Sequence, residues 1–348
     1  MSSSLSPIRV GVAGLGRSGW NIHCAAFGKL PDHYKVVAVT DPDQARMQEA
    51  NAKFGCAMHS SFDALINDPN VELVVVATPS KFHASNTISA LKAGKAVVCE
   101  KPFATSANEA DQVLKVADET GKLVAPFQNR RFAPDFRKVQ EILASGKLGR
   151  ITQIRCCVHS FGRRWDWQTL REFGGGELNN TGPHFLDQLL ELLGEGEPEI
   201  FCHLDRALTS GDADDCAKVI LRIPGRPLVE LEISKANAYP QKNWTIMGTS
   251  GSLTGSITEL SWKYVDFSKM PERPVDRTPQ SADRQYNRET LEFTEETWKA
   301  SPEESDLADN YYRSIYGTIR EGKPLVVTPQ SVRRQIHILQ RCHDLGGM

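Results

Sequence analysis

The chain has 348 residues, enough for two domains, and its 40% hydrophobic and 24% charged residues are ordinary for a soluble globular protein. Its 41 basic and 43 acidic residues nearly cancel, which argues against binding to nucleic acid or to an anionic membrane surface. The apolar runs are far shorter than the roughly 20 residues that span a bilayer, so no membrane partner is expected. Residues 1–7 are polar and lack the pattern of a signal peptide, so we expect a cytoplasmic protein.

Strand and helix signals alternate over residues 1–126, which we predict to form a Rossmann domain. Continuous apolar runs predict strands at Ile8–Val12, Val36–Thr40, Leu73–Ala77, Ala96–Cys99 and Leu123–Ala125. Helical spacing lies between them, as at Ser61–Asn67, Ser80–Ala93 and Ser106–Thr120. Apolar strands separated by helices favour a parallel sheet that is covered on both faces.

Residues 127–348 are predicted to form a second α/β domain around a large, mainly antiparallel open sheet. A helix at Asp135–Ala144 precedes strands at Ile151–Val158, Ala217–Ile223, Leu228–Ser234 and Trp244–Met247, several of them joined without helices. Residues 267–306 are rich in Pro, Ser and charged residues and are predicted to be a long irregular insertion, with Leu291, Phe293 and Trp298 as possible anchors. Helices follow at Leu307–Arg320 and Ser331–His343, and the last of them can pack back on the first domain.

Eight cysteines are scattered along the chain, and none forms a Cys-x-x-Cys pair. A zinc site would need ligands clustered at short spacing. We therefore predict reduced, mostly buried thiols and no metal.

A glycine-rich loop follows the first predicted strand. In this G-x-G-x-x-G pattern, Gly14 permits a tight turn, Gly16 lets the backbone approach a pyrophosphate, and Gly19 allows close helix–strand packing. The N-terminus of the next helix offers N–H groups and the positive end of its dipole to phosphates. An ordinary turn is the alternative, but the place of the loop in a βαβ unit favours cofactor binding. The predicted contacts from this segment are Gly14, Leu15, Gly16, Arg17, Ser18 and Gly19.

Asp41 ends the second predicted strand, 22 residues after Gly19. This is the expected place for a carboxylate that binds the adenosine ribose and repels a 2′-phosphate, so NAD is favoured over NADP. The alternative for Asp41 is a helix cap. Arg46 could turn toward a 2′-phosphate, although a solvated helix residue is the simpler interpretation.

Two further motifs carry groups suited to proton transfer. Lys101 follows a strand, where side chains of an open α/β sheet meet ligands, and its ammonium can stabilise a developing alkoxide. His184 follows Pro183 in the first turn of a helix, where the dipole disfavours the imidazolium and leaves a neutral base. Asp187 either orients His184 or merely favours the start of the helix, and these alternatives remain open.

Together these motifs resemble the Gfo/Idh/MocA oxidoreductase family, which includes glucose–fructose oxidoreductase and inositol dehydrogenases. The resemblance covers nearly the whole chain, and its specific part is the pairing of Glu100-Lys101-Pro102 with the Gly174–Gly176 run before His184. It implies an NAD-dependent enzyme, catalytic roles for Lys101 and His184, and a homodimer or homotetramer that forms through the second sheet. It also implies cofactor contacts from Thr78, Pro79, His83, Glu100, Lys101 and Asn129.

Asn180 departs from the pattern, because dehydrogenases of this family usually carry an aspartate four residues before the histidine. An amide can hydrogen-bond a hydroxyl but cannot take a proton at neutral pH. His184 can then be the sole base with Asn180 as a positioning group, or the activity can be reduced, redirected or lost. The two retained groups, Lys101 and His184, favour the first alternative.

Aromatic and polar residues lie together between the lysine and the histidine. Trp165, Asp166 and Trp167 follow Arg164, and such a mixture suits stacking on a sugar ring and pairing with its hydroxyls. The alternative is a loop whose tryptophans fill a hydrophobic seam. Gln128, Asn129 and Arg131 follow the last Rossmann strand, and by resemblance Asn129 is the one expected at the nicotinamide and substrate. The predicted substrate contacts are Asn180, Trp165, Asp166, Trp167, Arg164 and Asn129.

The sequence therefore predicts an NAD-dependent oxidoreductase that acts on a hydroxyl carbon of a sugar, inositol or sugar derivative. Two alternatives remain open. One is an NAD-dependent glycosidase that oxidises its substrate transiently and eliminates the aglycone. The other is a non-catalytic NAD-binding regulator, which Asn180 allows and Lys101 and His184 oppose.

Overall fold

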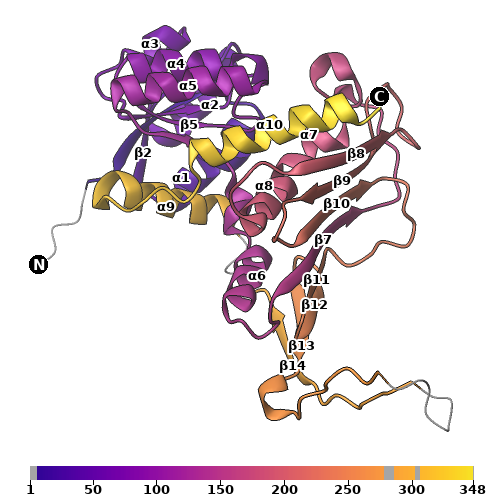
Figure 1. Ribbon diagram of the computed structural model, residues 1–348. Helices are drawn as coiled ribbons and strands as arrows, with labels where there is room; N and C mark the ends of the chain where they lie inside the picture. The colour runs from indigo at the N-terminus through magenta and orange to yellow at the C-terminus, as the bar shows by residue number, and fades with distance from the viewer. Residues whose placement is uncertain (1–5, 278–285, 302–305, 348) are drawn as a thin grey trace, which may run out of the picture.

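The protein is built on two sheets, which the computed structural model shows side by side (Figure 1). It describes residues 6–277, 286–301 and 306–347. The start of the chain and two parts of the predicted insertion, 278–285 and 302–305, lie outside the described residues. The fold class predicted from the sequence is confirmed.

The first sheet has six parallel strands in the order β3-β2-β1-β4-β5-β6. These strands are β1 (Ile8–Ala13), β2 (Tyr34–Thr40), β3 (Ala57–Met58), β4 (Leu73–Val76), β5 (Ala96–Cys99) and β6 (Val124–Pro126). All four residues of β4 are buried, as expected for a central strand with both faces covered. The helices that follow the strands are η1 (Gly19–Cys24), α1 (Ala25–Lys29), α2 (Gln44–Phe54), α3 (Phe62–Ile66), η2 (Ser80–Phe82), α4 (His83–Lys92) and α5 (Ala107–Thr120).

The second sheet has eight strands in the order β14-β13-β12-β11-β7-β10-β9-β8. The pair β7–β10 is parallel and the other pairs are antiparallel, so the sheet is mixed but mainly antiparallel. Its strands are β7 (Ile151–His159), β8 (Glu199–Asp205), β9 (Cys216–Arg222), β10 (Leu228–Ser234), β11 (Trp244–Gly248), β12 (Gly251–Gly255), β13 (Glu259–Tyr264) and β14 (Thr294–Lys299).

The prediction that residues 267–306 are irregular is wrong for part of this segment. After the short helix η6 (Phe267–Lys269), residues 294–299 form β14 at the edge of the sheet, where Trp298 lies opposite Leu260 and packs against the core. Phe293 is 49% exposed and anchors nothing in the core. The charged sequence of β14 does not predict a strand by apolar alternation, because an edge strand needs few apolar side chains.

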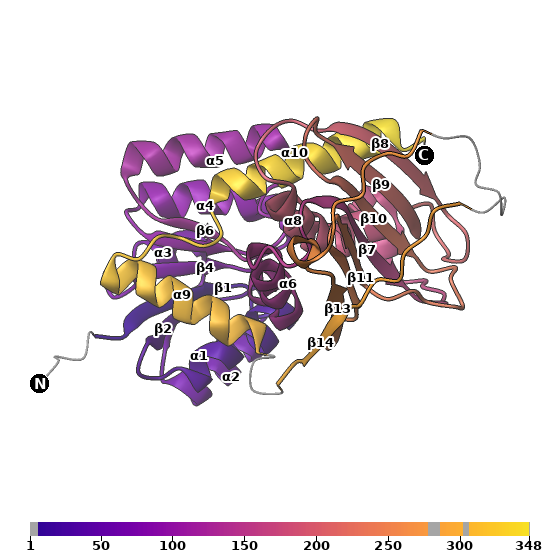
Figure 2. The ribbon, with the colours of Figure 1, turned by 60° about the horizontal axis from the view of Figure 1, so that its bottom comes forward.

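Helices pack on one face of the second sheet (Figures 1 and 2). They are α6 (Pro134–Ala144), α8 (Gly182–Leu193) and α10 (Pro329–Leu345), with the short α7 (Glu177–Asn180) preceding α8. Buried residues of α6, α8 and α10 share one hydrophobic cluster with alternate residues of the strands. The intervening short helices are η3 (Asn129–Phe132), η4 (Trp167–Thr169) and η5 (Arg171–Phe173).

The C-terminal segment connects the two sheets. Tyr311 and Tyr312 of α9 (Leu307–Glu321) lie in the hydrophobic cluster of the first sheet. The first half of α10 adds Ile336 to that cluster, whereas Ile338 and Cys342 join the cluster of the second sheet. This helix therefore fixes the relation between the two halves that flank the candidate site.

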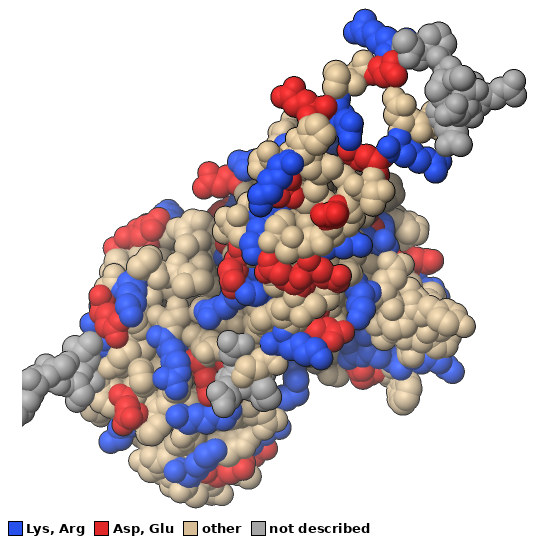
Figure 3. All heavy atoms as spheres, turned by 90° about the horizontal axis from the view of Figure 1, so that it is seen from below, with Lys and Arg blue, Asp and Glu red and all other residues tan. Residues whose placement is uncertain are grey.

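The distribution of surface charge and the burial of the cysteines are those expected from the composition. Seen from below, basic and acidic side chains are interspersed (Figure 3). Within the described residues, no helix is long and apolar enough to cross a bilayer. Seven of the eight cysteines are buried and Cys216 is partly buried, which confirms the predicted burial of the thiols.

Candidate active site

The glycine loop has the shape that a pyrophosphate needs. Gly14 has a φ of +90°, and a Cβ there would lie 2.4 Å from the carbonyl oxygen of Ala77. A Cβ on Gly19 would lie 1.9 Å from the carbonyl oxygen of Gly14, so the helix can approach the loop only without a side chain. A Cβ on Gly16, in contrast, would meet nothing within 4 Å, which leaves open space beside the backbone. These positions fit the turn, the close packing and the phosphate approach expected of a dinucleotide loop.

Residues within the loop differ in what they can offer. The side chain of Leu15 is buried in the core, so only its backbone can face a cofactor. Arg17 is exposed, and Ser18 precedes η1 at its N-cap position.

Asp41 joins the loop to the next helix. Its Oδ2 accepts a hydrogen bond from the Leu15 N–H at 2.6 Å, and its Oδ1 accepts one from the Asp43 N–H at 2.8 Å. The alternative that Asp41 caps α2 is wrong, because Asp43 is the cap and accepts from the Ala45 N–H. Arg46 lies 3.8 Å from the Asp41 carboxylate and 3.4 Å from that of Asp43, so it is paired in this structure.

His83 holds two loops together at the ends of neighbouring strands. Its ring is buried, and its nitrogens lie 2.7 Å from the carbonyl oxygens of Thr78 and Pro102. Thr78 also accepts a hydrogen bond from the Asn86 side chain at 3.1 Å. In this structure, therefore, His83 fixes the backbone beside Thr78–Pro79 and Lys101–Pro102.

Glu100 is a buried anion behind Lys101. It lies 3.1 Å from His23 Nε2 and accepts from the Lys101 N–H at 2.8 Å, while His23 Nδ1 lies 2.6 Å from the Tyr312 hydroxyl. Burial by itself would raise the pKa of the Glu100 carboxyl, but the hydrogen bond to His23 and the other neighbours outweigh it and lower that pKa. His23 and Tyr312 lie far apart along the chain, and no local pattern predicts that they meet at Glu100.

Lys101 reaches across to the helix that carries Asn180. Its Nζ lies 3.2 Å from the Asn180 carbonyl oxygen and 3.5 Å from Asn180 Oδ1. Burial lowers the pKa of Lys101, and the charge of Arg17 adds to this, while Glu100 and Glu177 oppose it. The structure thus brings together the two predicted motifs that are separated by nearly eighty residues.

His184 lies in the first turn of α8, as predicted. Its Nδ1 is buried and has no hydrogen-bond partner among the described residues. Burial, followed by the charges of Lys101 and Arg130, lowers the pKa of His184 to about 3. The imidazole is therefore neutral at ordinary pH and has an unfilled hydrogen-bonding nitrogen.

Asp187 does not orient His184, so that alternative is wrong. Its carboxylate forms a two-point ion pair with Arg131, at 2.5 Å to Nε and 2.9 Å to Nη2, and both side chains are buried. Arg131 also contacts Glu191 at 2.9 Å. Gln128 is buried as well and bonds Gln335 at 3.0 Å, which leaves Asn129, at the start of η3, as the polar side chain of this segment that is less enclosed.

Glu177 is a site residue that the sequence analysis missed. This buried carboxylate begins α7 and accepts from the Thr181 hydroxyl at 2.6 Å. Arg164 Nη1 lies 3.5 Å away and Lys235 Nζ 3.6 Å away. Its place directly after three glycines was visible in the sequence, but the cations that meet it come from distant segments.

The tryptophan loop faces solvent. Trp165 is 79% exposed and Trp167 is 61% exposed, so the alternative that they fill a hydrophobic seam is wrong. Trp167 packs edge to face on Phe173 with ring centroids 6.5 Å apart. Asp166 is held by Arg164 at 2.9 and 3.0 Å and caps η4 by accepting from the Gln168 N–H. A substrate hydroxyl bound by Asp166, as predicted, would therefore share its carboxylate with Arg164 and the Gln168 N–H.

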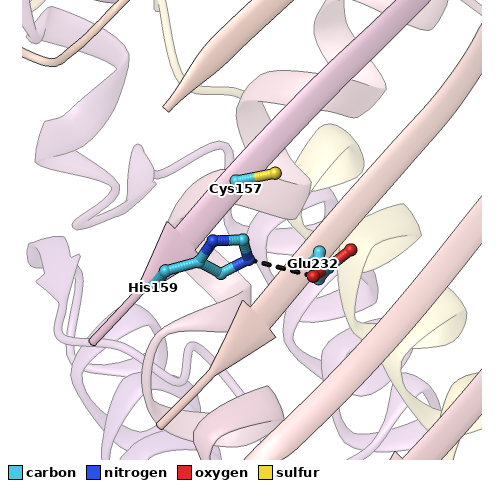
Figure 4. A group of neighbouring side chains, drawn as sticks. All are labelled: Cys157, His159 and Glu232. Atoms are coloured by element: carbon cyan, nitrogen blue, oxygen red, sulfur yellow. Dashed lines mark ion pairs between the residues drawn. The ribbon is translucent and has the colours of Figure 1, made fainter. Parts of the chain in front are cut away.

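A second cluster, of potential metal ligands, lies on the face of the large sheet that is turned away from α6, α8 and α10 (Figure 4). Cys157 and His159 alternate along β7, and Glu232 lies opposite Cys157 on β10. His159 Nδ1 accepts from the backbone N–H of Gln241 at 3.3 Å, and its Nε2 lies 3.1 Å from the Glu232 carboxylate. A metal-binding histidine would instead donate through its second nitrogen. Because Lys218 also bonds Glu232 at 2.7 Å, we assign this cluster to a network of ion pairs.

Family models match most of the chain. Residues 8–128 match the model described as an oxidoreductase family with an NAD-binding Rossmann fold, and residues 136–254 match a GFO/IDH/MocA C-terminal domain. The chain is 30% identical to 2,7-anhydro-N-acetylneuraminate hydratase from Escherichia coli (strain K12) over 73% of this chain and 69% of the relative. It is 32% identical to scyllo-inositol 2-dehydrogenase (NADP(+)) from Bacillus subtilis (strain 168) over 54% and 52% of the two chains.

Solved structures share the whole fold. The WlbA dehydrogenase from Bordetella pertussis, in complex with NADH and UDP-GlcNAcA, superposes with a TM-score of 0.77 at 20% identity. The match covers 97% of this chain and 95% of that one.

Proposed function

This chain belongs to the Gfo/Idh/MocA family of NAD-binding oxidoreductases, and on that basis we propose that it oxidises or reduces a hydroxyl-bearing carbon of a sugar, inositol or sugar derivative. NAD, when bound, supplies or accepts the hydride, and the side chains at the site handle the proton and orient the substrate. The observation that carries the proposal is the approach of Lys101 Nζ to Asn180, 3.2 Å from its carbonyl oxygen, one helical turn before a neutral His184.

In this proposal Lys101 and His184 divide the work on the substrate oxygen. An alcohol must lose a proton as its carbon loses hydride, and a neutral His184 can accept it. The Lys101 ammonium donates a hydrogen bond to the same oxygen and stabilises the negative charge that develops there. Burial of both groups strengthens these interactions, because the local dielectric is lower than that of water.

The remaining predicted residues are assigned to binding. Gly16 leaves open space for the pyrophosphate, and Asp41 lies where the ribose hydroxyls are expected. We keep NAD as the preferred cofactor because Asp41 would repel a 2′-phosphate, although one relative is named for NADP(+). The proposed substrate contacts are Asn180, Asn129, Arg164, Trp165, Asp166 and Trp167.

The exposed tryptophans support a substrate role rather than a packing role. Aromatic rings at the entrance can stack on a sugar ring, and closure of their loop would exclude water from the reacting carbon. Assembly through the large sheet also remains a proposal, consistent with Phe201 and Met247, which are 58% and 43% exposed on its strands.

A second candidate function is a reaction with no net oxidation. One relative that is 30% identical is named a hydratase, an enzyme that adds water. Transient oxidation of the substrate followed by elimination or hydration would use Lys101 and His184 in the same places and return the nicotinamide to its starting state. Release of product without accumulation of NADH would identify this chemistry.

The test is a substrate panel followed by both nicotinamide absorbance and product analysis. Inositols, aldoses and glycosides are supplied with NAD or NADP to the parent protein and to Lys101→Ala. Loss of this group should lower turnover roughly 10²–10⁴-fold and leave NAD affinity nearly intact. Lys92→Ala, an exposed lysine at the end of α4, is the matched control and should keep parent turnover. Near-normal turnover by Lys101→Ala would remove Lys101 from the mechanism.

A further inference from the structure

Two cations from two segments converge on the carboxylate of Glu177, and a third lies one helical turn away at Asn180. Arg164 comes from the loop after β7, Lys235 follows β10, and Lys101 follows β5 and reaches Asn180. The backbone holds the first two segments together, because the Gly162 N–H donates to the Lys235 carbonyl oxygen at 3.1 Å. The convergence is therefore built into the fold at the edge of the candidate active site.

The anions near these cations do not enclose them on every side. Glu177 and Asp166 lie against Arg164 and Lys235, and the buried Glu100 lies behind Lys101. Asp166 is 46% exposed, so solvent screens part of its effect. Asn180, the side chain that meets Lys101, is an uncharged amide and leaves the ammonium without a carboxylate partner at that point.

The two cations that cover Glu177 also have donors to spare. The side chain of Glu177 is only 5% exposed, whereas those of Arg164 and Lys235 are 29% and 26% exposed, so the cations lie on the open side. Lys235 Nζ approaches Glu177 only to 3.6 Å, beyond hydrogen-bond distance, and no shorter contact is seen in the described part of the chain. Arg164 uses Nε and Nη2 on Asp166 and leaves Nη1 with one long contact at 3.5 Å to Glu177.

We infer that the substrate is an acidic sugar or cyclitol, whose carboxylate binds between Lys235 and Arg164 while its reacting hydroxyl lies at Lys101 and His184. Two donor groups can each bond one of the two oxygens of a carboxylate. Glu177 is then a positioning residue, which holds both cations in place from behind. The inference rests on the proposed function for the location of the reacting carbon, and it adds the charge and the anchoring group of the substrate.

The experiment compares matched neutral and acidic substrates. Glucose with glucuronate, and galactose with galacturonate, are assayed with NAD, together with glucose 6-phosphate. We expect the parent protein to show a kcat/KM about tenfold or more higher for the acid of a pair, as a charge-assisted hydrogen bond provides. A neutral sugar that equals its acid would overturn the inference and leave the proposed function intact. A clear preference for the phosphate would overturn the assignment of a carboxylate.

Variants test the assigned residue. Lys235→Met should lower the ratio of acid to neutral kcat/KM about tenfold, and Lys235→Arg should restore most of it. Lys242→Met is the control, since Lys242 is an exposed lysine that pairs with Glu259 on the same domain, and it should keep the parent ratio. Asn180→Asp should also lower the ratio, because it places a negative charge beside Lys101. An unchanged ratio in Lys235→Met would overturn the inference.

A binding measurement decides the case in which no sugar of the panel is turned over. That result would count against the proposed function, and melting of the NADH complex with each ligand would then test the inference by itself. A rise in Tm with glucuronate or galacturonate but not with the neutral sugars, lost in Lys235→Met, would support an acid-binding site. An equal effect of acid and neutral sugars, or none, would overturn it.

Discussion

Replacing His184 with glutamine should change how the stability of the protein depends on pH. The pKa of His184 is lowered to about 3 by burial and by Lys101 and Arg130, whereas an unfolded histidine titrates near 6.5. Between these values His184 is protonated in the unfolded chain but not in the folded one, so the free energy of unfolding falls as the pH drops from 6.5 toward 3. From pH 7 to pH 4.5 this single group should remove about 2.5 kcal/mol of unfolding free energy from the parent protein.

Urea unfolding of the parent and of His184→Gln at pH 7 and pH 4.5 measures this contribution. Other groups titrate alike in both proteins, so the difference between them isolates His184, and it should move by about 2.5 kcal/mol in favour of the variant at the lower pH. His203→Gln, at an exposed position of β8, should lose stability in parallel with the parent. If His184→Gln also followed the parent in parallel, His184 would titrate normally, and its assignment as a permanently neutral base would fail.

Three further results are expected. Asp41→Ala should narrow the ratio of NAD to NADP affinity measured by titration calorimetry, and tighter NADP binding by the parent protein would contradict the role given to its carboxylate. Arg131→Met should lower the unfolding free energy by about 3–5 kcal/mol by leaving Asp187 buried and unpaired, and adding Asp187→Leu should recover most of the loss; a double variant as unstable as the single one would refute this. Trp167→Ala should raise KM roughly tenfold with little change in Tm, because this ring is 61% exposed; a large fall in Tm with unchanged KM would show a packing role instead.

Local sequence patterns predict most of the first sheet. Its strands follow from uninterrupted apolar runs and the glycine loop from its G-x-G-x-x-G spacing, and both features lie in a few adjacent residues. The outer strands of the second sheet were harder to predict. In β14 only Glu296 and Trp298 are partly buried, so a charged edge strand was taken for an irregular segment.

The helix that carries His184 shows which features a local sequence pattern can predict and which it cannot. The sequence could place His184 in a first turn and anticipate a neutral imidazole, and the structure agrees. It could not decide whether Asp187 faces His184 or another partner, because that depends on which distant side chain the packed helix meets. Arg131 arrives from the segment after β6 and takes both carboxylate oxygens.

The sequence by itself therefore determined the family and the Rossmann fold, and it singled out the glycine loop, Lys101 and His184 as candidates, because each motif consists of residues that are close along the chain. Only the tertiary structure decided the electrostatics around them. Arg164, Glu177 and Lys235 are brought together by strand pairing and by the start of α7 after the glycine run, and their charges act through space over a few ångströms. Such interactions have no signature in local sequence spacing, since Coulomb attraction depends on distance and burial rather than on order along the chain.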